Sequence, residues 1–316
     1  MKNSLADISD RIFPVVSSYI FGKRIIKLTF VQKTVMRFYH IYTKGLEDRL
    51  IFRSVEDFIA GMNYVAVAHF KANVRLLAFV LMSNHFHFVV VGSEEDARNF
   101  INLYKRLISV YIRNKYNDTA FLRRIITSCD EVSVKDDGLR RLIAYVLDNP
   151  VNAGVNCVAL AYPWGSAQCY FSNIPPEAIA IRSFSTRELR RILHSNVILP
   201  ETYLMGEAGY ILPQSYVDVQ FVENHFTRPK SLEYFLSVSA SSRKLKKDMV
   251  MFSDDIVRRA MYELLQNKYG VHSFDDVDSD MQVNLIKELR SHFNASAKQI
   301  ARITGCNLKA VVNILG

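Results

Sequence analysis

The sequence predicts an α+β fold, in which an antiparallel sheet of four or five strands is covered by helices and a small all-α domain follows. Short apolar runs rich in β-branched and aromatic residues predict the strands. Between them, apolar residues recur at helical spacing, and Ser54-Val-Glu-Asp57 and Ser93-Glu-Glu-Asp96 resemble capping boxes that start two helices. A small, polar and basic stretch, SVSASSRKLKK at 237–247, separates the last helical segments as a second domain.

The elements of the first domain follow from local patterns in chain order. Residues 1–32 show no assignable pattern, and the alternation at 33–42 predicts the first core strand. Apolar runs at 74–81 and 85–91 predict a strand pair, and a further strand is expected within 125–134. The two capped helices have apolar stripes made of Val55, Phe58, Ile59, Met62 and Ala66, and of Ala97, Phe100, Ile101, Tyr104, Leu107, Ile108 and Tyr111.

A pair of histidines opens the second strand of the stretch from Leu77 to Val91. The polar break Ser83-Asn84 predicts a tight turn between two antiparallel strands. His85 and His87 are two residues apart, so their imidazoles project from the same face of the strand. Neighbouring imidazoles suit a divalent metal ion, although a pair of core or surface histidines gives the same pattern.

A second polar cluster lies on the helix predicted from Leu139 to Pro150, for which Asp136 or Asp137 is a suitable N-cap. Tyr145 and Asn149 are four residues apart, one above the other on this helix. If the helix packs on the sheet face that carries the histidines, two imidazoles, a carboxamide and a phenol meet. That set suits phosphoryl transfer in which a tyrosine oxygen attacks phosphorus and forms a phosphotyrosine. The helix buries the stripe Leu139, Leu142, Ile143 and Val146.

Basic side chains on two predicted helices are expected to contact DNA, although a plain solvated face has the same pattern. The expected DNA contacts are Lys105, Arg106, Arg113 and Lys115 on the long helix, and Arg140 and Arg141 on the tyrosine helix.

Tyr104 and Tyr111 are rivals of Tyr145 as the nucleophile, but both belong to the apolar stripe of their helix and neither has a liganding residue one turn later.

The carboxyl-terminal segment has the pattern of a helix-turn-helix. Ser296-Ala-Lys-Gln299 resembles a capping box, a helix follows to Thr304, Gly305-Cys306 makes the turn, and Asn307 caps the last helix. A small helical bundle without a ligand is the alternative. In the helix-turn-helix geometry the residues that face the major groove of duplex DNA are Asn307, Lys309, Ala310 and Asn313.

Composition limits the class of protein. With 49% hydrophobic residues the chain is globular, and its net charge of +9 fits a polyanionic partner without requiring one. No signal peptide and no run of roughly 18 apolar residues is present, so no membrane association is expected. Four cysteines without a CxxC pair indicate reduced thiols in a cytoplasmic protein and no zinc site, namely Cys129, Cys157, Cys169 and Cys306.

Three stretches in this order resemble the REP-associated tyrosine transposases, HUH single-strand nucleases of the IS200-like single-tyrosine superfamily. The resemblance spans about residues 33–172, with further matches at Tyr39-His-Ile-Tyr-Thr-Lys-Gly45 and Ile51-Phe52. The family's Gly-x-Leu-Trp-Gln stretch is not recognisable around Asn117 to Arg124. The three stretches are Leu81-Met-Ser-Asn-His85-Phe-His87-Phe-Val-Val, Tyr145-Val-Leu-Asp-Asn149-Pro150-Val-Asn-Ala-Gly154 and Tyr162-Pro-Trp164-Gly-Ser166-Ala.

This resemblance implies a role for each residue of the cluster. His85 and His87 would be the metal pair, Asn149 the third ligand of one Mg²⁺ or Mn²⁺, and Tyr145 the nucleophile. It also implies a ferredoxin-like catalytic domain and single-stranded or hairpin DNA, from palindromic repeats, as the substrate. The product would be a 5′-phosphotyrosine with a free 3′-hydroxyl. A tyrosine has a pKa near 10, and the sequence identifies no base to deprotonate it. Both a monomer and a homodimer with composite sites fit.

The predicted domain organisation has five parts, and two rival functions remain open. One rival is a DNA-binding regulator whose nuclease domain is catalytically idle, and the other is a two-histidine hydrolase of a small molecule. The five parts are an N-terminal extension (1–32), a catalytic domain (33–175), a helical or irregular extension (176–236), a linker (237–249) and a helix-turn-helix-like domain (250–316).

Overall fold

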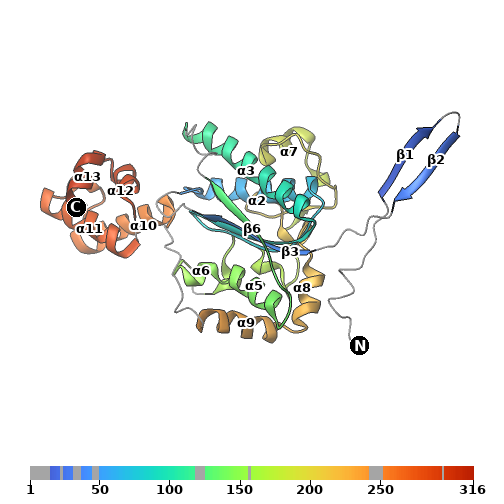
Figure 1. Cartoon of the computed structure of the whole chain (residues 1–316). Coiled ribbons are helices and arrows are strands. Elements are labelled where there is room, and N and C mark those ends of the chain that lie inside the picture. The colour runs from blue at the N-terminus through green and yellow to red at the C-terminus, as the bar shows by residue number, and fades with distance from the viewer. Residues whose placement is uncertain are drawn as a thin grey trace.

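A four-stranded antiparallel sheet lies at the centre of the structure, a computed structural model, in the order β4-β5-β3-β6 (Figure 1). The helix α2 (Val55–Lys71) joins β3 to β4, and α3 (Glu94–Tyr116) joins β5 to β6. The α+β class that the sequence predicts is therefore confirmed. The strands are β3 (Arg37–Lys44), β4 (Arg75–Leu81), β5 (Phe86–Gly92) and β6 (Ile126–Glu131).

The structure describes most of the chain, and several predictions fall outside the described part. Residues 31–36, which include the start of the predicted first strand, lie outside it, as do Cys157 and residues 118–124 of the segment that lacks the family stretch. Among the described residues, no helix is both long and apolar enough to cross a bilayer. The described residues are 15–21, 24–30, 37–44, 50–117, 125–155, 158–241, 252–293 and 295–316.

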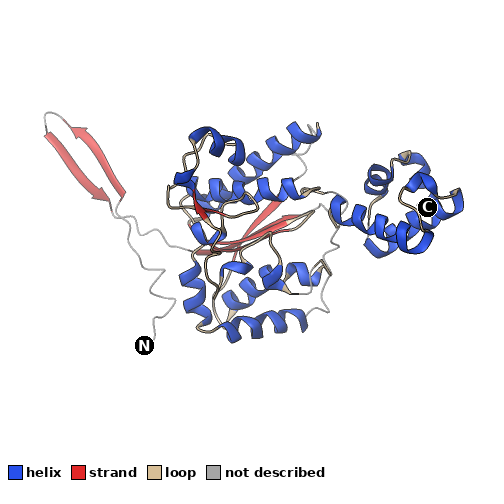
Figure 2. Cartoon of the chain, turned by 180° about the vertical axis from the view of Figure 1, so that it is seen from behind, coloured by secondary structure: helices blue, strands red, loops and turns tan. Residues whose placement is uncertain are grey.

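Helices cover both faces of the sheet, so the first domain has three layers (Figures 1 and 2). The helices α2 and α3 cover one face, where Phe86 and Phe88 of β5 pack on Tyr104 of α3, with ring centroids 5.1 Å apart. Since side chains alternate along a strand, His85 and His87 face the opposite layer. That layer contains α5 (Gly138–Leu147), α6 (Asn149–Asn152), α8 (Val219–Phe226) and α9 (Pro229–Ser241).

The stretch around Trp164 covers the exposed edge of β4. The Trp164 carbonyl accepts a hydrogen bond from the Leu81 amide at 2.8 Å, and the Ser166 amide donates to the Phe79 carbonyl at 3.0 Å. A Cβ on Gly165 would lie 2.7 Å from the Phe79 carbonyl oxygen, so only glycine allows this approach. The Tyr162 hydroxyl adds a bond to the Leu81 carbonyl at 2.8 Å. This stretch thus stabilises a sheet edge.

Residues 176–236 pack into the same hydrophobic core as the sheet, which runs from Phe38 to Leu236. Buried Asn63 of α2 anchors them, because its carboxamide donates to the Gly209 carbonyl at 3.2 Å and accepts from the Ile211 amide at 2.9 Å. The segment is therefore an integral part of the first domain. Its other elements are β7 (Ile179–Ala180), α7 (Thr186–Leu193) and β8 (Leu204–Met205).

The predicted linker begins too early. Helix α9 continues through Ser241, because serine and alanine are compatible with a helix when its apolar face is buried. Residues 242–251 lie outside the described part of the chain. At the other end, β1 (Val15–Phe21) and β2 (Arg24–Phe30) pair as an antiparallel hairpin within the N-terminal extension, which the sequence left unassigned.

The carboxyl-terminal helices form a second core of their own, from Val257 to Val311. Gly305 ends α12 with φ +77°, the left-handed conformation that glycine adopts without strain. Ser296 caps α12 as predicted, but Gln299 does not complete a capping box, because its amide binds the Phe252 carbonyl and Asp254. The helices are α10 (Asp254–Leu264), α11 (Ser279–Phe293), α12 (Ala297–Thr304) and α13 (Leu308–Leu315).

The remaining elements are single turns of helix within longer connections. They are η1 (Ala159–Ala161), η2 (Ala167–Cys169), η3 (Ile181–Ser183), η4 (Pro213–Ser215), the π-helical turn η5 (Leu265–Tyr269) and η6 (Phe274–Asp276).

Candidate functional site

The turn between β4 and β5 is fixed from two sides. The Met82 amide donates to the His85 carbonyl at 2.8 Å, which closes the tight turn. The Ser83 carbonyl accepts from the amides of Ile51 and Phe52 at 2.7 and 2.9 Å. The short Ile51-Phe52 motif therefore supports the turn, and the residue that follows the turn, His85, starts from a rigid backbone.

His85 is oriented by the residue before it. Its Nδ1 lies 2.8 Å from Oδ1 of Asn84. An amide oxygen only accepts hydrogen bonds, so Nδ1 carries the proton of the neutral ring and Nε2 carries a lone pair. His85 is 9% exposed and Asn84 3%, so this orientation is set in a largely water-free environment.

Asn149 faces His85 with its amide oxygen. Its Nδ2 donates to the Tyr145 carbonyl at 2.8 Å, which leaves Oδ1 3.4 Å from Nε2 of His85. A lone pair and an amide oxygen thus face one another, and a cation bound by both would stabilise this arrangement. The helix predicted to contain both residues is interrupted at Asp148, so that Asn149 begins α6.

Tyr145 lies beside the histidines. Its ring meets the ring of His87 edge to face, with centroids 5.7 Å apart, and that of His40 at 6.0 Å. The rings of His85 and His87 are 5.2 Å apart. The stripe of α5 that positions the tyrosine is buried as expected at Leu139, Ile143 and Val146, with Leu142 half-buried. The structure therefore brings together the two imidazoles, the carboxamide and the phenol.

Two aromatic residues of β3 complete the cluster. His40 Nε2 lies 3.0 Å from Nδ1 of His87, and the ring of Tyr42 stacks on His40 at 4.7 Å and on His87 at 5.9 Å. The sequence prediction missed both, although they lie within the stretch Tyr39 to Gly45. The missing signal was the register, which places Tyr42 directly opposite His87 and His40 two pairs further along, opposite Val89.

Burial keeps two of these imidazoles neutral. It lowers the pKa of His40 to about 4, with a small opposing effect from Asp130. Burial also holds the pKa of His87 well below its ordinary value, and the neighbouring His85 and His40 add to this effect. A histidine must be neutral to bind a metal ion, so the electrostatics suit that role.

The donor set fits a divalent metal ion on these observations. Within the described residues, no three histidine, cysteine, aspartate or glutamate side chains are grouped for metal binding. The Asn149 amide oxygen, 3.4 Å from Nε2 of His85, would be the third protein ligand beside the two imidazoles. Histidine suits manganese and carboxamide oxygen suits both manganese and magnesium.

The rival tyrosines lie on the other face of the sheet. Tyr104 is fully buried between α3 and β5, and Tyr111 packs on Tyr64 of α2 at 6.2 Å. Neither ring contacts His85 or His87 among the aromatic pairs of the described residues.

The predicted DNA contacts on α3 are separated from the tyrosine by the sheet. Arg106 and Arg113 are exposed and Lys105 is half-buried. Lys115 is a structural residue, because its ammonium lies 2.6 Å from the fully buried carboxylate of Asp57. Burial alone would lower the pKa of Lys115, but its hydrogen bond and charge interaction with Asp57 raise it. Lys115 is thus paired within the protein, and its contact with DNA stays a prediction.

Replacing Lys115 with alanine is expected to lower the free energy of unfolding by about 1–2 kcal/mol, because Asp57 loses a charged partner but keeps its backbone donors. Arg113→Ala, at an exposed basic residue two positions earlier on α3, is the matched control and should change the free energy of unfolding by less than about 0.5 kcal/mol. Urea denaturation followed by circular dichroism measures both. Equal effects of the two substitutions would contradict the structural role.

The two basic residues of α5 differ in their surroundings. The Arg140 guanidinium donates to the His225 carbonyl at 2.9 and 2.7 Å and pairs with Asp137 at 2.9 Å, so it ties α5 to α8, and its contact with DNA stays a prediction. Asp137 occupies the N-cap position with φ +61° but makes no side-chain cap. Arg141 is exposed.

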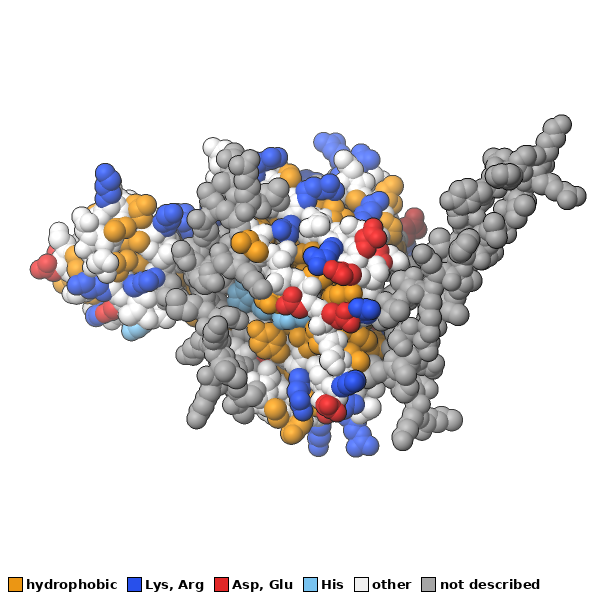
Figure 3. Space-filling model, viewed as in Figure 1, with side chains coloured by type: hydrophobic (Ala, Val, Ile, Leu, Met, Phe, Trp, Pro, Cys, Tyr) orange, Lys and Arg blue, Asp and Glu red, His pale blue; other side chains and the backbone are white. Residues whose placement is uncertain are grey.

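The residues of the last helix that were predicted to face DNA are exposed. Lys309 and Asn313 are exposed, and the Asn307 side chain is used as the N-cap, accepting from the Lys309 amide at 2.8 Å. Leu308 and Val312 are exposed beside them. On the face of the molecule seen in Figure 3, basic and acidic side chains are interspersed, and histidine side chains reach the surface near the middle of the first domain and again at the edge of the carboxyl-terminal domain.

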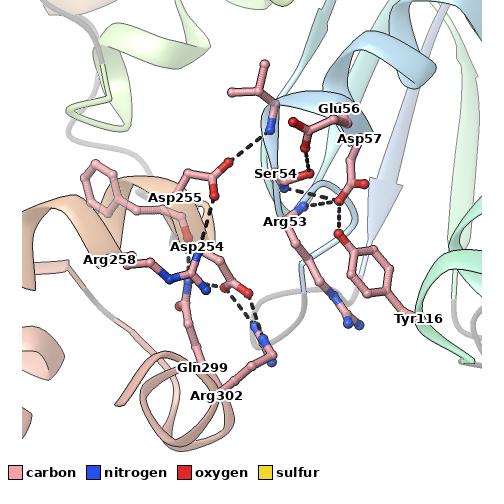
Figure 4. A network of polar contacts seen from close by, with 12 residues as sticks. Arg53, Ser54, Glu56, Asp57, Tyr116, Asp254, Asp255, Arg258, Gln299 and Arg302 are labelled. Atoms are coloured by element: carbon pink, nitrogen blue, oxygen red, sulfur yellow. Dashed lines mark hydrogen bonds and ion pairs between the residues drawn. The ribbon is translucent and has the colours of Figure 1, made fainter. Parts of the chain in front are cut away.

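The second domain contacts the first at the amino end of α2 (Figure 4). Asp255 accepts a hydrogen bond from the Val55 amide at 3.0 Å, and the preceding Asp254 is held by Arg302 at 2.7 and 2.8 Å. A cavity of about 130 Å³ lies between the domains, lined by Phe58, Met82 and Trp164 on one side and by Phe252 and Ile256 on the other.

Asp255→Ala is expected to loosen this docking, because a carboxylate at a helix amino terminus is worth about 0.5–2 kcal/mol. Trp164 is the single tryptophan of the chain and lines the cavity, so its fluorescence reports the contact. We expect the emission maximum to shift to the red as Trp164 gains water. Asp280→Ala, an exposed aspartate of α11, is the control. Unchanged emission in Asp255→Ala would show that the carboxylate does not hold the domains together.

Comparisons with known proteins give one distant likeness. No protein-family model matches the chain, and no curated protein matches it. The solved structure of a REP-associated tyrosine transposase bound to a REP hairpin matches 42% of this chain and 75% of its own, at 12% sequence identity and a TM-score of 0.33. A TM-score this low establishes neither a shared fold nor a shared activity.

Proposed function

We propose that this chain is a metal-dependent tyrosine transposase that cleaves and rejoins single-stranded or hairpin DNA. The observation that carries the proposal is the cluster itself. The centroid of the Tyr145 ring lies 5.7 Å from that of His87, and Asn149, four residues after Tyr145, places its amide oxygen 3.4 Å from Nε2 of His85. The β-α-β-β-α-β chain order, with strands in the order β4-β5-β3-β6, supports a ferredoxin-like domain.

In the proposed reaction the Tyr145 hydroxyl attacks the scissile phosphorus. The bond from phosphorus to the 3′-oxygen breaks, the tyrosine oxygen becomes esterified to the 5′-phosphate, and the departing 3′-oxygen takes up a proton as the phenol loses one. The ester retains the free energy of the phosphodiester, so the reverse attack by a 3′-hydroxyl rejoins a strand without ATP.

The roles of the other residues follow from their donor atoms. His85, His87 and Asn149 would hold one Mn²⁺ or Mg²⁺, which polarises the phosphate and stabilises the charge that develops on it. Asn84 orients His85 through the 2.8 Å contact at Nδ1. The sheet separates α3 from the tyrosine, so we assign strand binding near the cleavage site to Arg141 and leave Lys105, Arg106 and Arg113 as a separate surface.

The second domain is proposed to bind duplex DNA. Its separate core, the left-handed Gly305 turn and the exposed Lys309 and Asn313 of α13 support a helix-turn-helix. Because it docks on α2 through Asp255, duplex bound there would be held by the same molecule that cleaves the adjoining strand. Palindromic repeats would supply both the duplex DNA for the second domain and the hairpin for the first. Monomer and homodimer both fit this arrangement.

The test is covalent capture. Wild-type protein is incubated with Mn²⁺ and a panel of hairpin oligonucleotides that carry a 3′-label, and the products are run on a denaturing gel. The proposal predicts a labelled protein band that resists denaturant, with a free 3′-hydroxyl on the released fragment. A cut without any protein-linked DNA would exclude a tyrosine nucleophile.

A regulator with an idle nuclease domain is the second candidate, favoured by the independent core of residues 252–316. It predicts tight binding of duplex DNA by the full chain and no covalent band with any hairpin or metal ion. Duplex binding that Lys309→Ala weakens, without any adduct, would establish this alternative in place of the transposase.

A further inference from the structure

The ring of His87 is held on three sides by residues of two elements. Tyr42, its direct neighbour across the β3–β5 pair, stacks at an interplanar angle of 14°, and Tyr145 of α5 meets it edge to face. The third contact is the only one of the three at a ring nitrogen, where Nδ1 lies 3.0 Å from Nε2 of His40. That contact decides which nitrogen of His87 carries the proton.

Only one direction of this hydrogen bond is compatible with metal binding. If Nδ1–H of His87 donates to His40, then Nε2 of His87 carries a lone pair and is a ligand. If His40 donates instead, Nε2 of His87 carries the proton and cannot bind a metal ion. Imidazole ligands commonly donate their second nitrogen to an acceptor, and such partners strengthen metal binding.

We infer that His40 is a positioning residue, whose Nε2 accepts the hydrogen bond from Nδ1–H of His87 and so reserves Nε2 of His87 as a metal ligand. This role rests on the proposed metal-dependent function. His85 supplies an independent parallel, because its Nδ1 is held at 2.8 Å by the acceptor oxygen of Asn84, with Nε2 directed to Asn149. Both imidazoles of the pair thus have a dedicated acceptor at the same ring atom.

The position of His40 suits this role better than a packing role. It lies diagonal to His87 across the strand pair, since Tyr42 pairs with His87 and His40 with Val89. The rings of His40 and His87 are nearly parallel, with centroids 5.2 Å apart, against 5.9 Å between Tyr42 and His87, and of these two neighbours His40 is the one whose ring nitrogen meets Nδ1 of His87. A side chain that only filled space at position 40 would not need a nitrogen 3.0 Å from Nδ1 of His87.

The first test reads the tautomer directly in the metal-free protein. Long-range ¹⁵N–¹H correlation spectra of histidine-labelled wild type distinguish a proton on Nδ1 from one on Nε2. The inference predicts the Nδ1–H form for both His85 and His87. An Nε2–H form of His87 would overturn it without any variant having to fold.

The second test measures Mn²⁺ affinity by electron paramagnetic resonance of the free ion, which does not depend on cleavage. His40→Phe keeps a ring but no acceptor and is expected to weaken binding by about 10–100-fold. His40→Gln places an amide oxygen near the lost nitrogen and should recover most of that loss. His292→Phe, the same change at an exposed histidine of α11 in the second domain, is the matched control and should bind as wild type does. Thermal melts establish that each variant is folded.

The outcomes separate this inference from the proposed function. Equal Mn²⁺ affinity of wild type and His40→Phe, with binding still lost in His87→Ala, would overturn the role of His40 alone. Wild-type binding no tighter than that of His87→Ala would remove the metal site itself and both proposals with it.

Discussion

Tyr145→Phe is expected to abolish covalent attachment to hairpin DNA, with the amount of adduct falling by about 10³-fold or more. The substitution removes only the attacking oxygen. The ring remains, so its edge contacts with His87 and His40 are kept and α5 stays packed on the sheet. Because Asn149 is held through the Tyr145 carbonyl and not through its hydroxyl, the carboxamide also keeps its orientation. The loss is measured as labelled protein on a denaturing gel.

The control for Tyr145→Phe is the same substitution at a tyrosine on the other face of the sheet. Tyr104→Phe deletes a fully buried hydroxyl that has no hydrogen-bond partner within the described residues, so stability and adduct formation should both be retained. Mn²⁺ affinity of Tyr145→Phe should equal that of wild type. An adduct that survives Tyr145→Phe and disappears with another tyrosine would assign the nucleophile elsewhere.

His87→Ala is expected to lower both Mn²⁺ affinity and cleavage by more than about 10²-fold, because it removes one of three proposed ligands. His85→Ala removes the other imidazole and should lower Mn²⁺ affinity and cleavage in the same way, so the result does not depend on one variant. Removing the metal with a chelator should reproduce the loss of cleavage in wild type, and added Mn²⁺ should reverse it. Isothermal titration calorimetry and the gel assay measure the two quantities.

A histidine outside the cluster provides the comparison for these variants. His292→Ala changes an exposed residue of α11 in the second domain and should leave cleavage and metal binding unchanged. Thermal melts are needed for His87→Ala, since His87 is 3% exposed and its removal leaves a small cavity. Full cleavage by His87→Ala at low Mn²⁺ concentration would show that the imidazole pair does not bind the catalytic metal.

The local signals in the sequence were sufficient for most elements of the first domain. The alternation of side chains along a strand placed His85 and His87 on one face of the sheet. Helical spacing placed Tyr145 near the edge of the buried stripe of α5. The Ser54 and Ser93 signals mark the starts of α2 and α3, because a capping residue acts on its own first turn. These features depend on residues a few positions apart, and the sequence contains them directly.

Features that depend on long-range contacts were not predictable. The place of His40 beside His87 follows from the β3–β5 register, which no local pattern specifies. Lys115 and Arg140 were assigned to DNA because a basic residue on an amphipathic helix has the same pattern whether it is solvated or paired. Their partners, Asp57 and the His225 carbonyl, are 58 and 85 positions away. The core packing of residues 176–236 depends likewise on Asn63 of α2.

The central claim is that the Tyr145 oxygen becomes bonded to the 5′-phosphate of the cleaved strand. Mass spectrometry of the digested adduct tests it most directly, because trypsin leaves Tyr145 in a peptide that spans residues 142–182 with Tyr162 and Tyr170. The account predicts fragment ions that carry the nucleotide on Tyr145. A nucleotide on either other tyrosine, or on any residue outside this peptide, would contradict it.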